Sequence, residues 1–186
     1  MAEKTFESML TGGHPNSLGR TLEVVEIVLN DKTRLKELYR CYFSNDEIVR
    51  LRTSSAVKRV TIEHPEWLEP YLDRFLREIA QINQASTQWT LALLFDMLSD
   101  RMTSAQRSQA TDHLKNTLAT HTDWIVLNNT MKTLTKWAKK DEGLKAWLQP
   151  HLIRLKEDKR KAVVGNARKS LEALRQCSNT LAENGR

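Results

Sequence analysis

One six-residue motif occurs twice in this chain, at places 80 positions apart. Residues 67–72 read WLEPYL and residues 147–152 read WLQPHL, so both follow the pattern W-L-x-P-x-L. A second pattern precedes each copy: Asp46 and Asp123 are followed, at the same offsets, by a valine, a threonine and a pair of small or apolar residues. A distance of 80 positions corresponds to two units of about 40 residues. We therefore predict a stack of such units, because each unit must bury its apolar face against the next.

Each unit is predicted to contain two helices. In the second half of one unit, apolar residues recur at spacings of three and four and form one stripe along a helix. That stripe consists of Leu68, Tyr71, Leu72, Phe75, Leu76 and Ile79. In the first half the same spacing selects mostly small residues, which let a neighbouring helix come close: Val49, Thr53, Ala56, Val57 and Val60. The sequence predicts helix pairs at 17–29/31–43, 46–63/66–81, 85–99/104–119 and 123–139/142–157, followed by a helix at 160–177.

The fold class predicted from these pairs is all-α. Glycine and proline number only 6 and 4 among 186 residues, so few positions favour the turns of a many-stranded sheet. Pro70 and Pro150 are expected a few residues into their helices, where a missing N–H costs least. We expect a right-handed α-α superhelix, or solenoid, of about four helix pairs plus a C-terminal helix. Its domain spans 17–177, after an N-terminal segment with a Gly-rich loop at 1–16 and before a flexible tail at 178–186.

The repeat resembles the HEAT branch of the HEAT/armadillo-like family. Asp46, Val49 and Arg50, followed by Ala56 and Val57, match that family's D-x-x-V-R-x-x-A-x-x-A-L core, with Thr53 in place of the first alanine. The resemblance implies an Asp–Arg ladder between repeats for the unit with Asp46 and Arg50, whereas Leu127 replaces the basic residue in the later unit. It also implies a second option, since some HEAT-like proteins are alkylpurine DNA glycosylases. The candidate acids for that chemistry are Asp96, Asp112 and Asp123.

The positive charge of the chain is concentrated in its C-terminal half. Residues 1–93 hold 12 basic and 13 acidic residues, whereas residues 94–186 hold 17 and 10. Along the helix predicted at 123–139 and at the position after it, basic residues lie at i, i+4, i+7 and i+8, which places them on one helical face. They are Lys132, Lys136, Lys139 and Lys140. Such a stripe is either a solvated helical surface or a site that neutralises the phosphates of nucleic acid without reading bases.

Two more groups are candidate binding residues. Arg50 and Arg52 belong to a basic cluster on the helix predicted at 46–63. His14, Asn16 and Arg20 lie in or beside the Gly-rich loop, whose spacing differs from that of a nucleotide-binding phosphate loop. The loop either forms a turn at the end of the first repeat or presents helix amides beside Arg20 and His14 to an anion. Four tryptophans are expected in the core or, alternatively, as stacking surfaces: Trp89, Trp124, Trp137 and Trp147.

No spacing typical of a catalytic or metal site is present in the sequence. Its five histidines are scattered, and Cys41 and Cys177 cannot build a Cys-rich zinc site. We therefore expect no metal and no cofactor. The N-terminal residues do not resemble a secretory signal and no apolar stretch is long enough to span a bilayer, so we expect a reduced, cytoplasmic protein without a membrane partner.

The function expected from the sequence is a non-enzymatic scaffold that binds a protein or peptide on its concave surface. The alternative is nucleic-acid binding by the C-terminal basic stripe, with glycosylase-like repair as one form of it.

Overall fold

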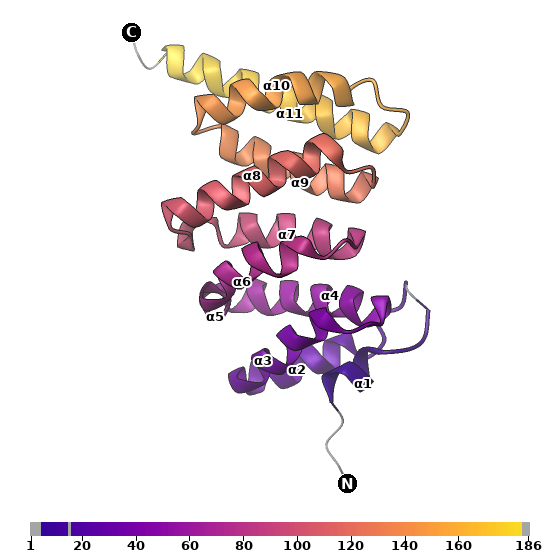
Figure 1. The fold of residues 1–186 in the computed structure, drawn as a ribbon. Coiled ribbons are helices and arrows are strands. Elements are labelled where there is room, and N and C mark those ends of the chain that lie inside the picture. The colour runs from indigo at the N-terminus through magenta and orange to yellow at the C-terminus, as the bar shows by residue number, and fades with distance from the viewer. Residues whose placement is uncertain (1–4, 15, 184–186) are drawn as a thin grey trace. The chain divides into compact units, whose positions relative to one another are not determined.

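The structure, a computed structural model, describes residues 5–14 and 16–183, with side chains up to residue 176. Within these residues all regular structure is helical and no strand occurs, which confirms the predicted all-α class (Figure 1). The residues divide into two compact units, Met1–Arg107 and Ser108–Arg186, where the sequence predicts one repeat domain over 17–177. No helix in the described part of the chain has both the length and the apolar composition that crossing a membrane requires.

Three longer helices lie side by side in the first unit: α2 (Thr21–Asn30), α4 (Glu47–Glu63) and α7 (Ala85–Met97). Helix α4 lies between the other two and packs against both (Figure 1). The connecting segments are short α and 3-10 helices: η1 (Lys32–Arg34), α3 (Leu35–Arg40), η2 (Cys41–Phe43), α5 (Pro65–Leu68), η3 (Glu69–Tyr71), α6 (Leu72–Arg77), η4 (Ile79–Gln81) and η5 (Ser99–Arg101). The single helix predicted at 66–81 is thus interrupted, with Pro70 in its first 3-10 turn, because proline lacks the N–H that an α-helix needs.

The predicted apolar stripes form the core of this unit. Leu68, Leu72 and Phe75 are at most 1 % exposed. On α4, the small residues Val49 and Ala56 are fully buried. Burying each large aliphatic or aromatic side chain stabilises the fold by roughly 1.5–3 kcal/mol, so these stripes hold the helices together.

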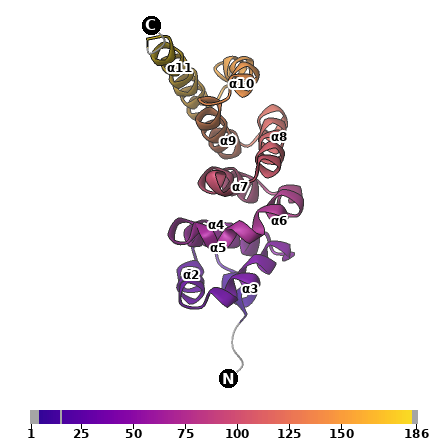
Figure 2. The ribbon, with the colours of Figure 1, turned by 90° about the vertical axis from the view of Figure 1, so that its left-hand side faces the viewer.

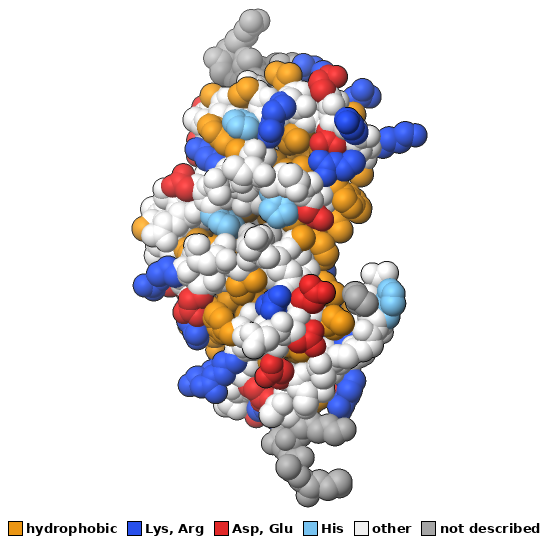
Figure 3. Space-filling view, turned by 45° about the vertical axis from the view of Figure 1, so that its right-hand side comes forward, with side chains coloured by type: hydrophobic (Ala, Val, Ile, Leu, Met, Phe, Trp, Pro, Cys, Tyr) orange, Lys and Arg blue, Asp and Glu red, His pale blue; other side chains and the backbone are white. Residues whose placement is uncertain are grey.

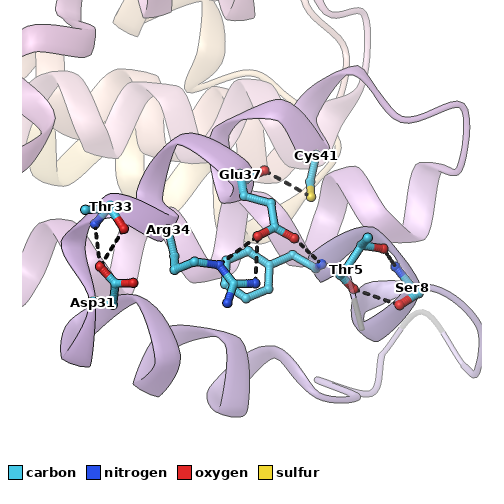
Figure 4. A network of polar contacts seen from close by, with 8 residues as sticks. Thr5, Ser8, Asp31, Thr33, Arg34, Glu37 and Cys41 are labelled. Carbon is cyan, nitrogen blue, oxygen red and sulfur yellow. Dashed lines mark hydrogen bonds and ion pairs between the residues drawn. The ribbon is translucent and has the colours of Figure 1, made fainter. Parts of the chain in front are cut away.

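The segment predicted to precede the first helix contains a helix of its own, α1 (Phe6–Leu10). Thr5 caps it, and its Phe6 side chain is fully buried. Figure 4 shows how α3 holds it: Glu37 accepts a hydrogen bond from the Phe6 N–H at 2.7 Å and one from Arg34 Nε at 2.8 Å. The Arg34 guanidinium lies 4.6 Å from the centre of the Phe6 ring. Tertiary contacts therefore stabilise a helix too short to persist alone.

The second unit contains most of α8 (Ser104–Thr120), then α9 (Trp124–Ala138), α10 (Glu142–Leu155) and α11 (Lys161–Glu183). Helix α9 packs against both α10 and α11, and Figure 2 shows α11 running beside it. Asp123 and Asp141 cap the starts of α9 and α10 by accepting backbone hydrogen bonds. Helix α11 continues through residues 178–183, which were predicted to be a flexible tail, and residues 184–186 lie outside the described residues.

The prediction that Pro150 lies only a few residues into its helix is wrong. It lies inside α10, eight residues after Glu142, and not in the first turn. The helix continues past it, because Leu148 and Leu152 on either side are fully buried and hold both halves of the helix in the core. Packing here outweighs the loss of one backbone hydrogen bond.

Candidate anion-binding surface

The nine predicted binding residues fall into three groups. The first group, His14, Asn16 and Arg20, lies in or beside the loop before α2, and the second, Arg50 and Arg52, lies on α4. Both groups belong to the first compact unit. The third group lies in the second unit, on α9 and in the turn after it: Lys132, Lys136, Lys139 and Lys140.

Arg52 is a buried residue, 3 % exposed, and holds the Gly-rich loop in place. Its Nη1 donates to the carbonyl oxygens of Leu10 and Gly12, both at 2.7 Å, and its Nε donates to that of Ser17 at 3.2 Å. The sequence predicted Arg52 as a binding residue of a basic cluster, but a buried guanidinium that donates to backbone carbonyl oxygens is not open to a ligand. We therefore assign Arg52 to the structure of the loop.

The rest of the loop group fits the predicted turn better than an anion site. The His14 ring accepts a hydrogen bond from the Asn16 N–H through Nδ1, at 3.2 Å, and both residues are exposed. Arg20 forms a two-bonded ion pair with Glu23, whose carboxylate occupies the place an anion would take. That contact raises the pKa of Arg20. Pro15 lies outside the described residues.

Arg50 links one helix pair to the next. It is half-buried and donates to the side-chain oxygen of Gln84 and to the Ser44 carbonyl, both at 2.6 Å. Gln84 stands at the cap position of α7, as Asp46 does for α4. Arg50 therefore contacts the residue at the cap of the next long helix, as the arginine of an Asp–Arg ladder would. That residue is Gln84, whereas the ladder needs an acidic residue in this place.

Three of the four lysines in the third group line an open groove between α9 and α11, with a cavity of about 360 Å³. Its four charged lining residues are all lysines: Lys132 and Lys136 from α9, Lys139 directly after that helix, and Lys169 from α11. Thr135, Asn166 and Ser170 complete the lining. We call these seven residues the lysine groove. Figure 3 shows one face of the molecule, on which Lys and Arg side chains lie beside apolar and acidic ones.

Helical periodicity on α9 explains why the lysines share a face. Val126, Met131 and Leu134, on the other side of this helix, are fully buried against its neighbours. The lysines lie three and four positions apart and are all exposed. Lys140 is also exposed, but it lies beyond the end of α9 and outside the groove lining.

Lys169 lies in the groove because α11 occupies the position that the first helix of one more helix pair would have. Val163, Ala167 and Ser170 stand 37 positions after Val126, Thr130 and Thr133. Lys169 stands at the same distance after Lys132. This weaker copy of the repeat, near residues 161–171, is the sequence signal for Lys169. Thr135 and Asn166 had no such signal, because their role depends on the two helices lying side by side.

The four tryptophans, expected in the core or alternatively as stacking surfaces, differ in their exposure. Trp137 is 4 % exposed. The Trp147 ring stacks on His151 with ring centres 3.9 Å apart and has the Lys115 ammonium 5.3 Å from its centre. Trp89 is half-buried, whereas Trp124 is 46 % exposed.

A nucleophile was not predicted, and the described thiol is poorly suited to be one. Cys41 is 5 % exposed, and burial raises its pKa to about 12, so it is protonated at neutral pH. The Cys177 side chain lies outside the described residues. Asp123, a candidate acid, uses its carboxylate to cap α9. Among the described residues, no three His, Cys, Asp or Glu side chains lie close enough together to hold a metal ion.

No protein-family model matches this chain, and no match is found among curated proteins. Fold and site define the class of protein as all-helical, with a lysine-lined groove in its C-terminal unit. The resemblance to HEAT repeats stays a prediction.

Proposed function

We propose that this protein is a non-enzymatic, HEAT-like helical protein that binds nucleic acid through the lysine groove, by contacts to the phosphate backbone. One observation carries the proposal: two helices separated by a third place four lysines around one open groove. Lysine ammonium groups are compact point charges that suit phosphate oxygens.

The dimensions of the groove fit a phosphate backbone. Lys132 and Lys139 are seven residues apart, which corresponds to about 10 Å along a helix axis. A DNA duplex presents one charge per about 1.7 Å of its axis, so about six phosphate charges pass over that length. A rigid helix face with lysines on successive turns can contact several of them at once, and such contacts carry no sequence information.

Binding of a fluorescent 20-base-pair duplex, followed by anisotropy at 50 mM salt, tests the proposal. The test variant carries Lys132→Gln, Lys136→Gln, Lys139→Gln and Lys169→Gln. A matched control removes four other exposed positive charges by changing Lys36, Arg40, Arg77 and Lys159 to Gln. We expect the groove variant to lose at least tenfold in affinity and the control to lose much less.

Competition separates nucleic acid from other polyanions. Poly-glutamate carrying the same number of charges as the duplex should displace it poorly, because carboxylates on a flexible chain lack the fixed spacing of phosphates. Equal competition by poly-glutamate, or equal losses in the two variants, would contradict the proposal.

Binding of a protein or peptide partner stays a prediction. The exposed large apolar residues are spread over five helical elements and one loop: Leu18, Leu22, Phe43, Ile62, Trp124 and Ile153. Single exposed apolar residues are normal on a protein surface, so they do not favour this function.

A further inference from the structure

A second basic cavity borders α11 in the C-terminal unit. It has a volume of about 510 Å³ and lies between the end of α10 and the second half of α11. Its described lining holds three basic residues, one acid and one leucine: Lys156, Arg168, Leu171, Glu172 and Arg175. We call these five residues the arginine groove. Both arginines are exposed, so their guanidinium groups are open to a ligand.

The arginine groove and the lysine groove lie on opposite flanks of α11. Asn166 lines the lysine groove and Arg175 lines the arginine groove, and these two residues are nine positions apart on one helix. At about 100° per residue, they point in opposite directions from the helix axis. Val163, Ala167 and Leu174, on the inner face between the two flanks, are fully buried. One helix, about 10–12 Å across with its side chains, therefore separates two basic grooves.

The spacing of the basic residues is the same on both flanks. Arg168 and Arg175 are seven residues apart, as Lys132 and Lys139 are, which corresponds to about 10 Å along a helix axis. One strand of a duplex carries a phosphate about every 3.4 Å, so about three phosphates of one strand pass over each groove. The two backbones of a B-form duplex are separated by a major groove about 12 Å wide, which is close to the width of one helix.

We infer that the nucleic acid bound by this protein is double-stranded, with one backbone on the lysine groove, the other on the arginine groove, and α11 between them. Guanidinium groups bind phosphate oxygens in pairs of hydrogen bonds, so the arginines suit the second backbone as the lysines suit the first. The inference rests on the proposed function, because the lysine groove must hold the first backbone. A single strand occupies one groove at a time and does not need the arginine groove.

Two probes of one sequence test the inference: the fluorescent 20-base-pair duplex and its labelled strand alone. The full chain carries Lys156→Gln, Arg168→Gln and Arg175→Gln, and anisotropy is followed at 50 mM salt. We expect this arginine-groove variant to lose about tenfold or more in affinity for the duplex, because the contacts to one backbone are removed. Its affinity for the single strand should stay within about twofold of that of the original protein.

Two further variants serve as controls. Changing Lys36, Arg40 and Arg77 to Gln removes three exposed positive charges from the first unit and should affect the duplex much less. Glu172 accepts a hydrogen bond from the Gln176 amide at 3.4 Å and is the acid in the lining of the arginine groove. Glu172→Gln should strengthen duplex binding by roughly threefold, because it removes a negative charge beside the second backbone. A gain in affinity cannot result from misfolding.

The outcomes separate this inference from the proposed function. A duplex loss in the arginine-groove variant no larger than that in the charge control overturns the inference, while the proposed function stands if the lysine-groove variant still loses affinity. Equal losses for duplex and single strand also overturn the inference, because one strand would then cross both grooves. Binding of neither probe by the original protein overturns both.

Discussion

The guanidinium of Arg52 donates to the carbonyl oxygen of Gly12 at 2.7 Å, across 40 positions of sequence. The same side chain also donates to the carbonyl of Leu10, the last residue of α1, so one buried residue of α4 fixes both the end of α1 and the loop after it. This relationship gives the Gly-rich loop a structural role.

Replacing Arg52 by alanine should lower the free energy of unfolding by about 2–4 kcal/mol, because several carbonyl oxygens lose their charged donor. Urea denaturation followed by circular dichroism measures this. Arg20→Ala, which removes a more exposed arginine paired with Glu23, serves as control and should cost less than about 1 kcal/mol. Similar losses for the two variants would mean that Arg52 does not hold the loop.

Gly19 should tolerate alanine worse than Gly12. Both have positive φ, +51° and +71°, which costs a residue with a Cβ about 1–2 kcal/mol. A Cβ at Gly19 would also lie 2.7 Å from Arg52 Cζ, whereas a Cβ at Gly12 meets nothing within 4 Å. We predict a clearly larger loss of stability for Gly19→Ala in the same denaturation experiment. An equal loss would show that the contact with Arg52 does not matter.

Thr135→Val and Thr117→Val should have different effects on stability. Valine at 135 replaces an unpartnered buried hydroxyl, so stability should stay within about 0.5 kcal/mol or rise. Valine at 117 removes a hydrogen bond to the His113 carbonyl and should cost about 1 kcal/mol. Thermal unfolding at equal protein concentration measures both. A loss at 135 as large as that at 117 would indicate that the Thr135 hydroxyl has a partner in the folded protein.

Asp158 should make stability depend on acid pH. Hydrogen bonds from the Arg160 side chain and N–H lower the pKa of Asp158 from 3.8 to about 2. Because the folded-state pKa is the lower one, the contribution of Asp158 is present above pH 4 and is lost as the pH falls towards 2. Asp158→Asn should remove this part of the pH dependence. Unfolding midpoints measured from pH 5 to pH 2 test this prediction. A parallel loss of stability in the original protein and in Asp158→Asn would contradict it.

Helix positions could be predicted from the sequence because periodic apolar spacing determines which faces are buried. The longer helices α4, α8 and α9 lie within one or two residues of the predicted ranges. Helix α1 was missed although Phe6, Met9 and Leu10 show helical spacing. Three apolar residues give a weak signal, and the contacts from Glu37 and Arg34 that stabilise α1 come from about 30 residues away.

Residue roles were harder to predict than helices. Arg52 and Lys136 look alike in sequence, as basic residues on helices, yet Arg52 points into carbonyl oxygens and Lys136 lines an open groove. The difference depends on which helix face packs against the loop. The unpartnered hydroxyl of Thr135 could not be predicted at all, because a threonine without a hydrogen-bond partner looks like any other threonine in the sequence.

The salt dependence of duplex DNA binding tests the central claim most directly. Four lysine–phosphate contacts predict a slope of about −3.6 for the logarithm of the binding constant against the logarithm of salt concentration, or about 150-fold weaker binding at 200 mM than at 50 mM. Each lysine of the groove changed to glutamine should reduce the slope by about 0.9. A slope near zero, or one that the groove variant leaves unchanged, would contradict the claim.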